Sequence, residues 1–143
     1  MLDDDLRAFL DGCPVGVLAT QSADGSPRQS LVYFARRDEQ LLISTLGDRL
    51  KARDVERTGR ASLCAMGHEP PYPSVTLSGP ARIITEQIGP GTATIAQRIS
   101  GASEPPEPMS DAVLAEAGRV LLEITIERVT APSYIPPAGA ADA

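Results

Sequence analysis

The segment from Arg49 to Arg60 concentrates positive charge in an otherwise acidic chain. It reads RLKARDVERTGR and holds five cations against two acids, whereas the 143-residue chain carries a net charge of −6. Arg49, Arg53 and Arg57 are spaced four apart, as on the solvated face of a helix. Arg49 and Lys51, the only lysine, would lie in the first helical turn, where free N–H groups favour a bound anion and an unpaired cation is mildly unfavourable. From the residues alone, an anion site and a solvated face are equally good interpretations.

Two hydroxyl residues, Ser44 and Thr45, end the apolar run that precedes this segment. Their hydroxyl groups would add donors for a phosphate or a carboxylate. Other catalytic patterns are absent, because the sequence has no glycine-rich phosphate loop, no zinc-ligand spacing and a single histidine, His68, in a proline-rich loop. The sequence therefore indicates no metal site, and it leaves the catalytic residues unknown.

The composition argues against several classes of partner. A charge of −6 and only 3% aromatic residues disfavour binding to nucleic acid. No apolar run approaches the roughly 18 residues of a membrane span, and the acidic start MLDDDLRAFL is unlike a signal peptide. Cys13 and Cys64 lie in apolar stretches, as reduced, buried cysteines do. We expect a cytoplasmic protein that binds neither nucleic acid nor membrane.

The elements that would position these residues are mostly strands. A short amphipathic helix is expected at 2–11, with acidic residues in its first turn. Strands are expected at 15–21, 28–37 and 40–45, and the turn at Asp24-Gly25 is typical of an antiparallel meander. The basic segment 48–57 breaks this pattern and is expected to be a helix, with Asp48 as its N-cap.

The second half of the chain continues in the same way. We expect strands at 60–67 and 74–87, the latter bent at Gly79-Pro80, then helices at 91–100 and 109–117, with Ser110 as the second N-cap. Leu122, Ile124 and Ile126 alternate with polar residues in 119–129, which predicts a half-buried strand. Six strands with short flanking helices predict a mainly β (α+β) barrel in one domain, residues 1–130, followed by a flexible tail at 131–143.

In their order along the chain, these features resemble the pyridoxamine-5'-phosphate-oxidase-like family of FMN-binding split barrels, and within it the branch that uses coenzyme F420. The segments that carry the resemblance are Val15-Gly-Val-Leu-Ala-Thr20, Asp24-Gly25-Ser-Pro27, Leu42-Ile-Ser44, Arg49-x-Lys51-x-Arg53, Arg60-Ala-Ser-Leu63, Gly79-x-Ala81 and Leu121-x-Glu123. They cover residues 2–130, with the poorest match at 88–118. The resemblance implies a split β-barrel of about six antiparallel strands with short peripheral helices, assembled as a homodimer.

The same resemblance implies a cofactor groove at the interface of the dimer. The residues that would form it are Ser44, Thr45, Arg49 and Lys51 for the phosphate-bearing tail, Arg28, Ser30 and Val32 for the ring, and, from the partner subunit, Tyr72. We expect an oxidoreductase that uses coenzyme F420, or FMN as second choice, for hydride transfer to a small conjugated or heteroaromatic substrate. The alternatives are a protein that binds or stores a cofactor without turnover, and a split barrel that binds another anion, such as the propionates of haem.

Overall fold

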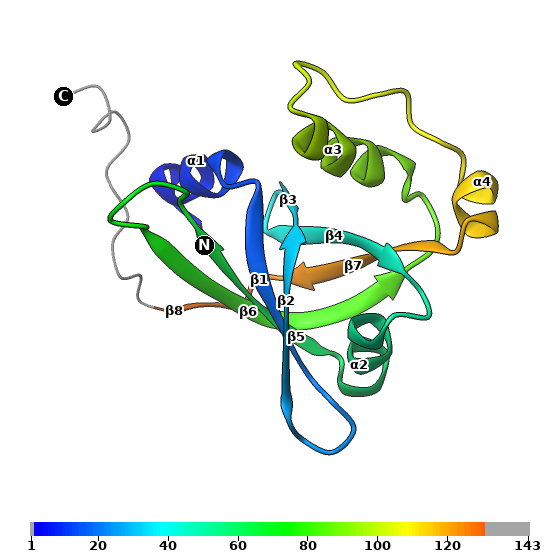
Figure 1. The fold of residues 1–143 in the computed structure, drawn as a ribbon, viewed down its shortest axis with the longest axis horizontal. Coiled ribbons are helices and arrows are strands. Elements are labelled where there is room, and N and C mark those ends of the chain that lie inside the picture. The colour runs from blue at the N-terminus through cyan, green and yellow to red at the C-terminus, as the bar shows by residue number, and fades with distance from the viewer. Residues whose placement is uncertain (1, 131–143) are drawn as a thin grey trace.

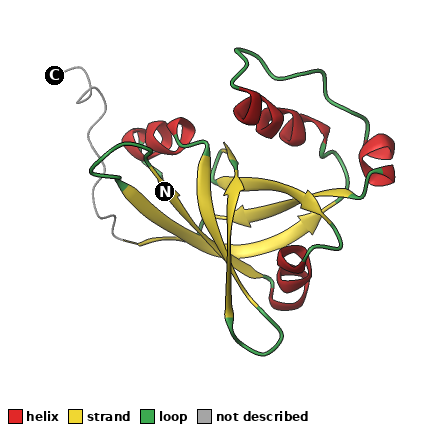
Figure 2. Cartoon of the chain, in the orientation of Figure 1, coloured by secondary structure: helices red, strands yellow, loops and turns green. Residues whose placement is uncertain are grey.

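The computed structural model describes residues 2–130, which form eight strands and four helices (Figures 1 and 2). The strands are β1 (Val15–Gln21), β2 (Pro27–Tyr33), β3 (Ala35–Arg37), β4 (Gln40–Leu46), β5 (Arg60–Met66), β6 (Ser74–Ile84), β7 (Arg119–Thr125) and β8 (Arg128–Thr130). The helices are α1 (Asp4–Gly12), α2 (Leu50–Thr58), α3 (Gly89–Ser100) and α4 (Asp111–Glu116). The tail predicted at 131–143 lies outside the described residues.

The strands form one antiparallel sheet in the order β2-β1-β5-β6-β7-β4-β3, with β8 beside β6. This confirms the mainly β split barrel, and the two strands beyond the six predicted in residues 2–130 are three-residue pieces, β3 and β8. The four described helices are 6 to 12 residues long, and none has the length and hydropathy needed to cross a bilayer.

The sheet curls because two long segments change partners along their length. β6 pairs with β5 as far as Pro80 and with β7 beyond it. Gly79 permits this bend, because a Cβ atom at that position would lie 1.9 Å from the carbonyl oxygen of Thr125. The extended segment that contains β2 and β3 changes partners at Phe34, pairing first with β1 and then with β4. Phe34 therefore joins the two ends of the strand order, and the sheet becomes a half-barrel (Figure 1).

Aliphatic side chains from the strands fill the inside of this half-barrel. α1 adds Leu6 and Leu10 to this core, and α2 adds Val55. A smaller core lies on the other face of β4 and β7, where Ile95 of α3 and Leu114 of α4 are buried. α1 and α2 thus complete the barrel, whereas α3 and α4 cover the outside of one half of the sheet (Figure 2).

The structure corrects several predicted boundaries. The strand predicted at 28–37 is divided at Phe34 into β2 and β3. The N-cap of α2 is Arg49, not Asp48, and no side chain caps the helix. β6 ends at Ile84 instead of residue 87, and the strand predicted at 119–129 is interrupted after Thr125. The N-cap at Ser110 is confirmed, since its hydroxyl accepts a hydrogen bond from the N–H of Val113 in the first turn of α4.

The prediction that β7 is only half-buried was wrong. Residues 120–124 are all buried, because the inner core covers one face and α3 and α4 cover part of the other. Glu123, expected on the solvated face, is 3% exposed. Its charge is neutralised by Arg82 of the adjacent strand β6 at 2.8 Å and by Arg37 of β3, the strand beyond β4, at 3.2 Å.

Candidate functional site

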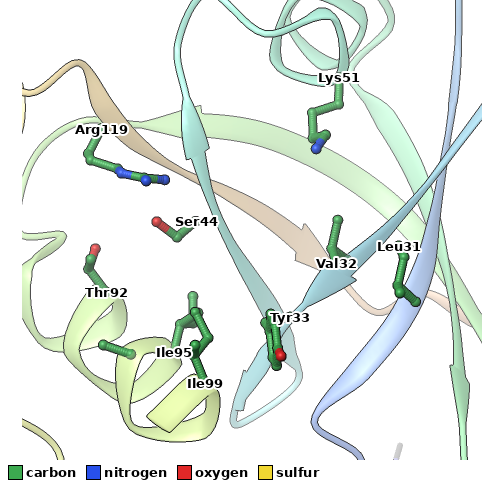
Figure 3. Close-up of a pocket in the computed structure, with 10 residues that line it drawn as sticks. Leu31, Val32, Tyr33, Ser44, Lys51, Thr92, Ile95, Ile99 and Arg119 are labelled. Atoms are coloured by element: carbon green, nitrogen blue, oxygen red, sulfur yellow. The ribbon is translucent and has the colours of Figure 1, made fainter.

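A cavity of about 380 Å³ lies between α3, the start of α2 and the strands β2, β4 and β7 (Figure 3). We call it the α2–α3 pocket, and its lining residues are Leu31, Val32, Tyr33, Ser44, Lys51, Thr92, Ile95, Ala96, Ile99 and Arg119. Two of these are cations and none is a carboxylate, although the chain has 19 acidic and 13 basic residues. The pocket is therefore positive in a negative protein, which suits an anionic ligand.

The start of α2 supplies one part of this positive charge. The N–H groups of Leu50 and Lys51 lie in the first turn, where they have no partner within the helix, and no acidic residue lies there to offset the helix dipole. The side chain of Lys51 points into the pocket (Figure 3). Burial, and secondly the charge of Arg49, lower the pKa of Lys51. A bound anion would oppose both effects, because it would favour the charged ammonium group.

Ser44 lines the pocket, whereas Thr45 does not. Successive residues of a strand point to opposite faces of the sheet. Ser44 shares its face of β4 with Leu42, which packs in the α3–α4 core, and Thr45 is buried on the barrel side with 5% exposure. Of the site residues predicted from sequence, the structure brings Ser44, Val32 and Lys51 together in this pocket.

Arg28 lies outside the pocket and contacts a buried acid. Its Nε donates a hydrogen bond of 2.7 Å to Oδ2 of Asp54. Asp54 also accepts hydrogen bonds from the hydroxyl of Thr20 at 2.8 Å and from Arg57 at 3.1 Å. Burial alone would raise the pKa of Asp54, but these three hydrogen bonds outweigh burial and hold the pKa below its ordinary value. We call Asp54 and its three donors the Asp54 cluster.

The Asp54 cluster divides the basic segment into two groups. Arg57 belongs to the cluster, and Arg60 pairs with Glu127 at 3.4 Å. Within residues 2–130 the remaining cations of the segment form no ion pair, and these are Arg49, Lys51 and Arg53. Of the unpaired cations, only Lys51 lines the pocket. Arg49, which was predicted as a site residue, is the exposed N-cap of α2 and lies outside the pocket, as does Arg53.

Ser30 and Tyr72, also predicted as site residues, do not line the pocket of their own chain. Ser30 is half-buried on β2, two residues before Val32. Tyr72 is 57% exposed in the loop between β5 and β6. This loop follows β5, whereas α2 precedes it, so the full length of β5 separates Tyr72 from the start of α2 (Figure 1). A role for Tyr72 in the pocket of a partner subunit stays a prediction.

Sequence reasoning missed the residues that α3 and β7 contribute. Thr92, Ile95 and Ile99 of α3 form one wall, and Arg119 at the start of β7 forms another (Figure 3). Nothing in the local pattern links Arg119 to Lys51, because the pairing of β4 with β7 brings distant segments together. The helical spacing of Thr92, Ile95 and Ile99 was the one available signal, since it places them on a single face of the helix.

The wall formed by α3 is held at both of its ends. Arg98, near its C-terminus, donates to the carbonyl oxygens of Asp11 at 3.0 Å and Leu10 at 3.3 Å, and its guanidinium lies 5.5 Å from the ring centre of Phe34. At its N-terminus, Asp111 accepts hydrogen bonds from the N–H groups of residues 87 and 88. These contacts fix α3 against α1 and α4, and so they fix the width of the pocket.

The part of the pocket that is formed by β2 and by the C-terminal end of α3 is apolar. Leu31 and Tyr33 of β2 are 69% and 41% exposed, and Ile99 of α3 is 56% exposed. Large apolar side chains that cluster at a cavity while exposed to water mark a binding surface. The α2–α3 pocket therefore suits a ligand with an anionic part at Lys51 and an apolar part near Leu31 and Tyr33.

Comparisons with known proteins agree with this architecture. The chain superposes on a conserved hypothetical protein from Mycobacterium tuberculosis with a TM-score of 0.72 at 22% identity, covering 90% of this chain and 82% of that one. An F420 reductase gives a TM-score of 0.68 at 23% identity, with 92% and 98% covered. HutZ, the haem storage protein from Vibrio cholerae, gives 0.65 at 16%, with 93% and 96% covered. At these identities the likeness shows the fold alone.

The family assignment comes from the sequence match. The family model described as pyridoxamine 5'-phosphate oxidase matches residues 2–131, which is nearly the whole of the chain. The resemblance inferred from the ordered segments is therefore confirmed at the level of the family. By this match and by its curled antiparallel half-barrel, the chain belongs to the pyridoxamine 5'-phosphate oxidase family.

Proposed function

We propose that the α2–α3 pocket binds a flavin-type cofactor and that the protein is an oxidoreductase that uses it. The observation that carries this proposal is the combination of Lys51, the free N–H groups of α2 and the Ser44 hydroxyl in a pocket without a carboxylate. This set of donors fits the phosphate of a flavin or deazaflavin tail. The exposed apolar residues Leu31 and Tyr33 fit a ring system.

In this proposal the protein binds and orients the cofactor and shields it from water, and the cofactor supplies the hydride transfer. Lys51 and Ser44 would hold the tail, and the side chains of β2 would lie against the ring. Ile95 and Ile99 of α3 would exclude water from the apolar part of the pocket. A small conjugated or heteroaromatic compound is the substrate class that such an apolar wall suits.

Coenzyme F420 remains the first choice of cofactor and FMN the second. The tail of the deazaflavin carries a phosphate, a lactyl carboxylate and glutamates, so it presents more negative charge than the single phosphate of FMN. A pocket with two cations and no acid favours the more highly charged tail. The fold similarity to a protein named F420 reductase is in keeping with this choice.

A second candidate is a protein that binds a cofactor without turnover. The lining of the α2–α3 pocket includes no carboxylate or imidazole, and its groups that could act as a general acid or base are Lys51 and Tyr33. If Lys51 holds the anion, Tyr33 is the one such group left for turnover, and this favours the second candidate in one respect. His68 lines a different cavity, beside Arg98 and Asp11. The second candidate therefore differs from the first in turnover, not in the place of binding.

The assembly that we propose is a homodimer. The outer face of β1 and β5 carries small or apolar side chains that belong to neither core of the described residues, namely Val15, Val17, Ala19, Ser62, Cys64 and Met66. Leu31 and Tyr33 extend this face across β2, because they pair with Val17 and Val15. The face is thus continuous with the apolar part of the pocket, and a second copy seated on it would complete the pocket's open side.

Absorbance spectroscopy after reconstitution tests the proposal. Purified protein is incubated with F420, FMN or haem and desalted, and the retained chromophore is identified from its spectrum. We expect F420 to be retained more than FMN. In a second experiment the protein is loaded with F420 that has been reduced beforehand to F420H2, and we expect members of a panel of conjugated carbonyl and heteroaromatic compounds to oxidise it by accepting its hydride. Retention without oxidation would favour the second candidate, and retention of haem alone would contradict both assignments of cofactor.

A further inference from the structure

Arg119 approaches the α2–α3 pocket from the side opposite Lys51. Gly118 has a φ of +73° and precedes β7, so the strand begins with Arg119, paired with Leu46 of β4. Alternate residues of a strand share a face, which places Arg119 on the same face as Ser44. Figure 3 shows the guanidinium of Arg119 and the ammonium of Lys51 extending toward the pocket on either side of Ser44.

No acidic residue of the described chain neutralises Arg119. Within residues 2–130 it forms no ion pair. The acid on its own face of β7 is Glu123, four residues along the strand and therefore about 13 Å away. Glu123 is buried and already held by Arg37 and Arg82. The guanidinium of Arg119 is thus available to a ligand.

A single phosphate at the start of α2 would leave Arg119 unused. Lys51 and Arg119 belong to different elements and lie on two sides of Ser44, so one small anion at the N–H groups of α2 does not need both cations. Thr92 of α3 lies on the Arg119 side of the pocket. Its hydroxyl donates a hydrogen bond of 2.7 Å to the carbonyl oxygen of Ile88, so it would have to turn from that carbonyl to donate to a ligand. The two sides of the pocket therefore offer two separate cations for anions, Lys51 on one side and Arg119 on the other.

We propose that Arg119, with Thr92 beside it, provides a second anion subsite, in which its guanidinium takes a carboxylate of the cofactor's tail while Lys51 holds the phosphate. This inference rests on the proposed function, and it deepens that function by naming the residue that discriminates between cofactors. A deazaflavin tail has a phosphate and a carboxylate to fill both subsites, whereas FMN has a single phosphate. Arg119 is then a specificity residue for F420 over FMN.

Affinity measurements on two cofactors test the subsite. F420 and FMN are titrated, by fluorescence, into wild type, Arg119→Ala and Lys51→Ala. Arg53→Ala is the matched control, because Arg53 is an exposed arginine of α2 that forms no ion pair within residues 2–130 and does not line the pocket. The melting temperature of each apo protein shows that the variants are folded.

Arg119→Ala is expected to weaken F420 binding by about 10- to 100-fold, the effect of one charge-assisted hydrogen bond, and FMN binding by less than about threefold. Lys51→Ala is expected to weaken the binding of both cofactors, and Arg53→Ala is expected to change the binding of neither. Arg119→Lys, which keeps the charge, should retain most of the affinity for F420. If Arg119→Ala lost affinity equally for both cofactors, or for neither, the second subsite would be overturned while the proposed function stayed intact.

If wild type binds neither cofactor, the proposed function fails, and the subsite is tested with inorganic tripolyphosphate. We then expect the amide NMR signals of Lys51 and Thr92 to shift together on titration, and the Thr92 shift to be lost in Arg119→Ala. A shift confined to the start of α2 would contradict a second subsite. These outcomes separate failure of the cofactor assignment from failure of the role given to Arg119.

Discussion

The Nε atom of Arg28 lies 2.7 Å from Oδ2 of Asp54, and this contact ties β2 to α2 beside the pocket. The side chain of Asp54 is 3% exposed and also accepts hydrogen bonds from Thr20 of β1 and Arg57 of α2. Asp54 lies three residues after Lys51, so it shares one turn of α2 with the proposed anion site. The Asp54 cluster thus fixes the helix whose first turn carries Lys51 and the proposed anion site.

Removal of the Asp54 carboxylate should destabilise the protein. Asp54→Ala leaves a buried hydroxyl without its acceptor and two partly exposed arginines, Arg28 at 33% and Arg57 at 41%, without their acid, which should cost about 1–3 kcal/mol. Urea unfolding measures the change in the free energy of unfolding. Asp48→Ala is the control, because Asp48 is exposed just before α2 and its loss should cost no more than a few tenths of a kcal/mol. Equal stabilities of the two variants would show that the cluster contributes little.

The contribution of Asp54 should also depend on pH. Its pKa is lowered in the folded state, so the stabilisation is present above the unfolded pKa, about 3.9, and is lost as the pH falls through the folded pKa. We therefore expect the stability difference between wild type and Asp54→Asn to be largest near neutral pH and to narrow below about pH 4. Urea unfolding across this range measures it. A difference that stays constant to pH 2 would contradict a lowered pKa.

The Asp54 cluster also shows why the partners of the charged residues could not be assigned from the sequence. Local patterns predict the elements well, because turn residues and hydrophobic periodicity act over a few positions. Arg28 and Asp54 are 26 positions apart, so nothing local indicates that they pair. The family resemblance implied that Arg28 contacts a cofactor ring, whereas the structure places it in an ion pair with Asp54, outside the α2–α3 pocket.

The candidate site was predictable where it is formed by residues that are close together in the sequence. Lys51 and Ser44 were found because a helix start and the end of the preceding strand adjoin in the sequence. Thr45 was included with Ser44 because the sequence does not say which face of β4 meets α3. Arg119 was missed because its place depends on the pairing of β4 with β7, a contact between segments far apart in the chain.

Gly79 should be among the least replaceable residues of the barrel. A Cβ atom there would lie 1.9 Å from the Thr125 carbonyl oxygen, so Gly79→Ala must displace backbone at the bend of β6 and should cost about 3 kcal/mol or more. Gly12→Ala is the matched control, because no atom lies within 4 Å of a Cβ at that position of α1, and it should be neutral or stabilise by up to about 1 kcal/mol. Thermal unfolding compares them. Similar melting temperatures would contradict a sterically closed bend.

The sheet face proposed for dimerisation can be tested by placing a charge on it. Light scattering of the wild type should give a molar mass of about twice the 15.1 kDa of the monomer. Val17→Lys puts an ammonium group at the centre of the face and should shift the protein toward monomer, because burying an unpaired charge is costly. Val113→Lys makes the same change on α4, at a position that is 52% exposed, and should leave the dimer intact. A wild type that is monomeric at micromolar concentration would remove this assembly.

Lys51→Ala should separate ligand binding from stability. If Lys51 holds an anion, its loss weakens cofactor binding by about 1.5–3 kcal/mol, the value of a hydrogen bond to a charged group. The apo protein should be unchanged or more stable by up to about 0.5 kcal/mol, because a cation has left the positive end of the α2 dipole. A solvated lysine would leave the cofactor affinity unchanged and would alter the stability by a few tenths of a kcal/mol in either direction, so the affinity is the measurement that separates the two cases. Fluorescence titration and apo melting temperature, measured on the same preparations as wild type, distinguish these two patterns, and an unchanged affinity would remove Lys51 from the site.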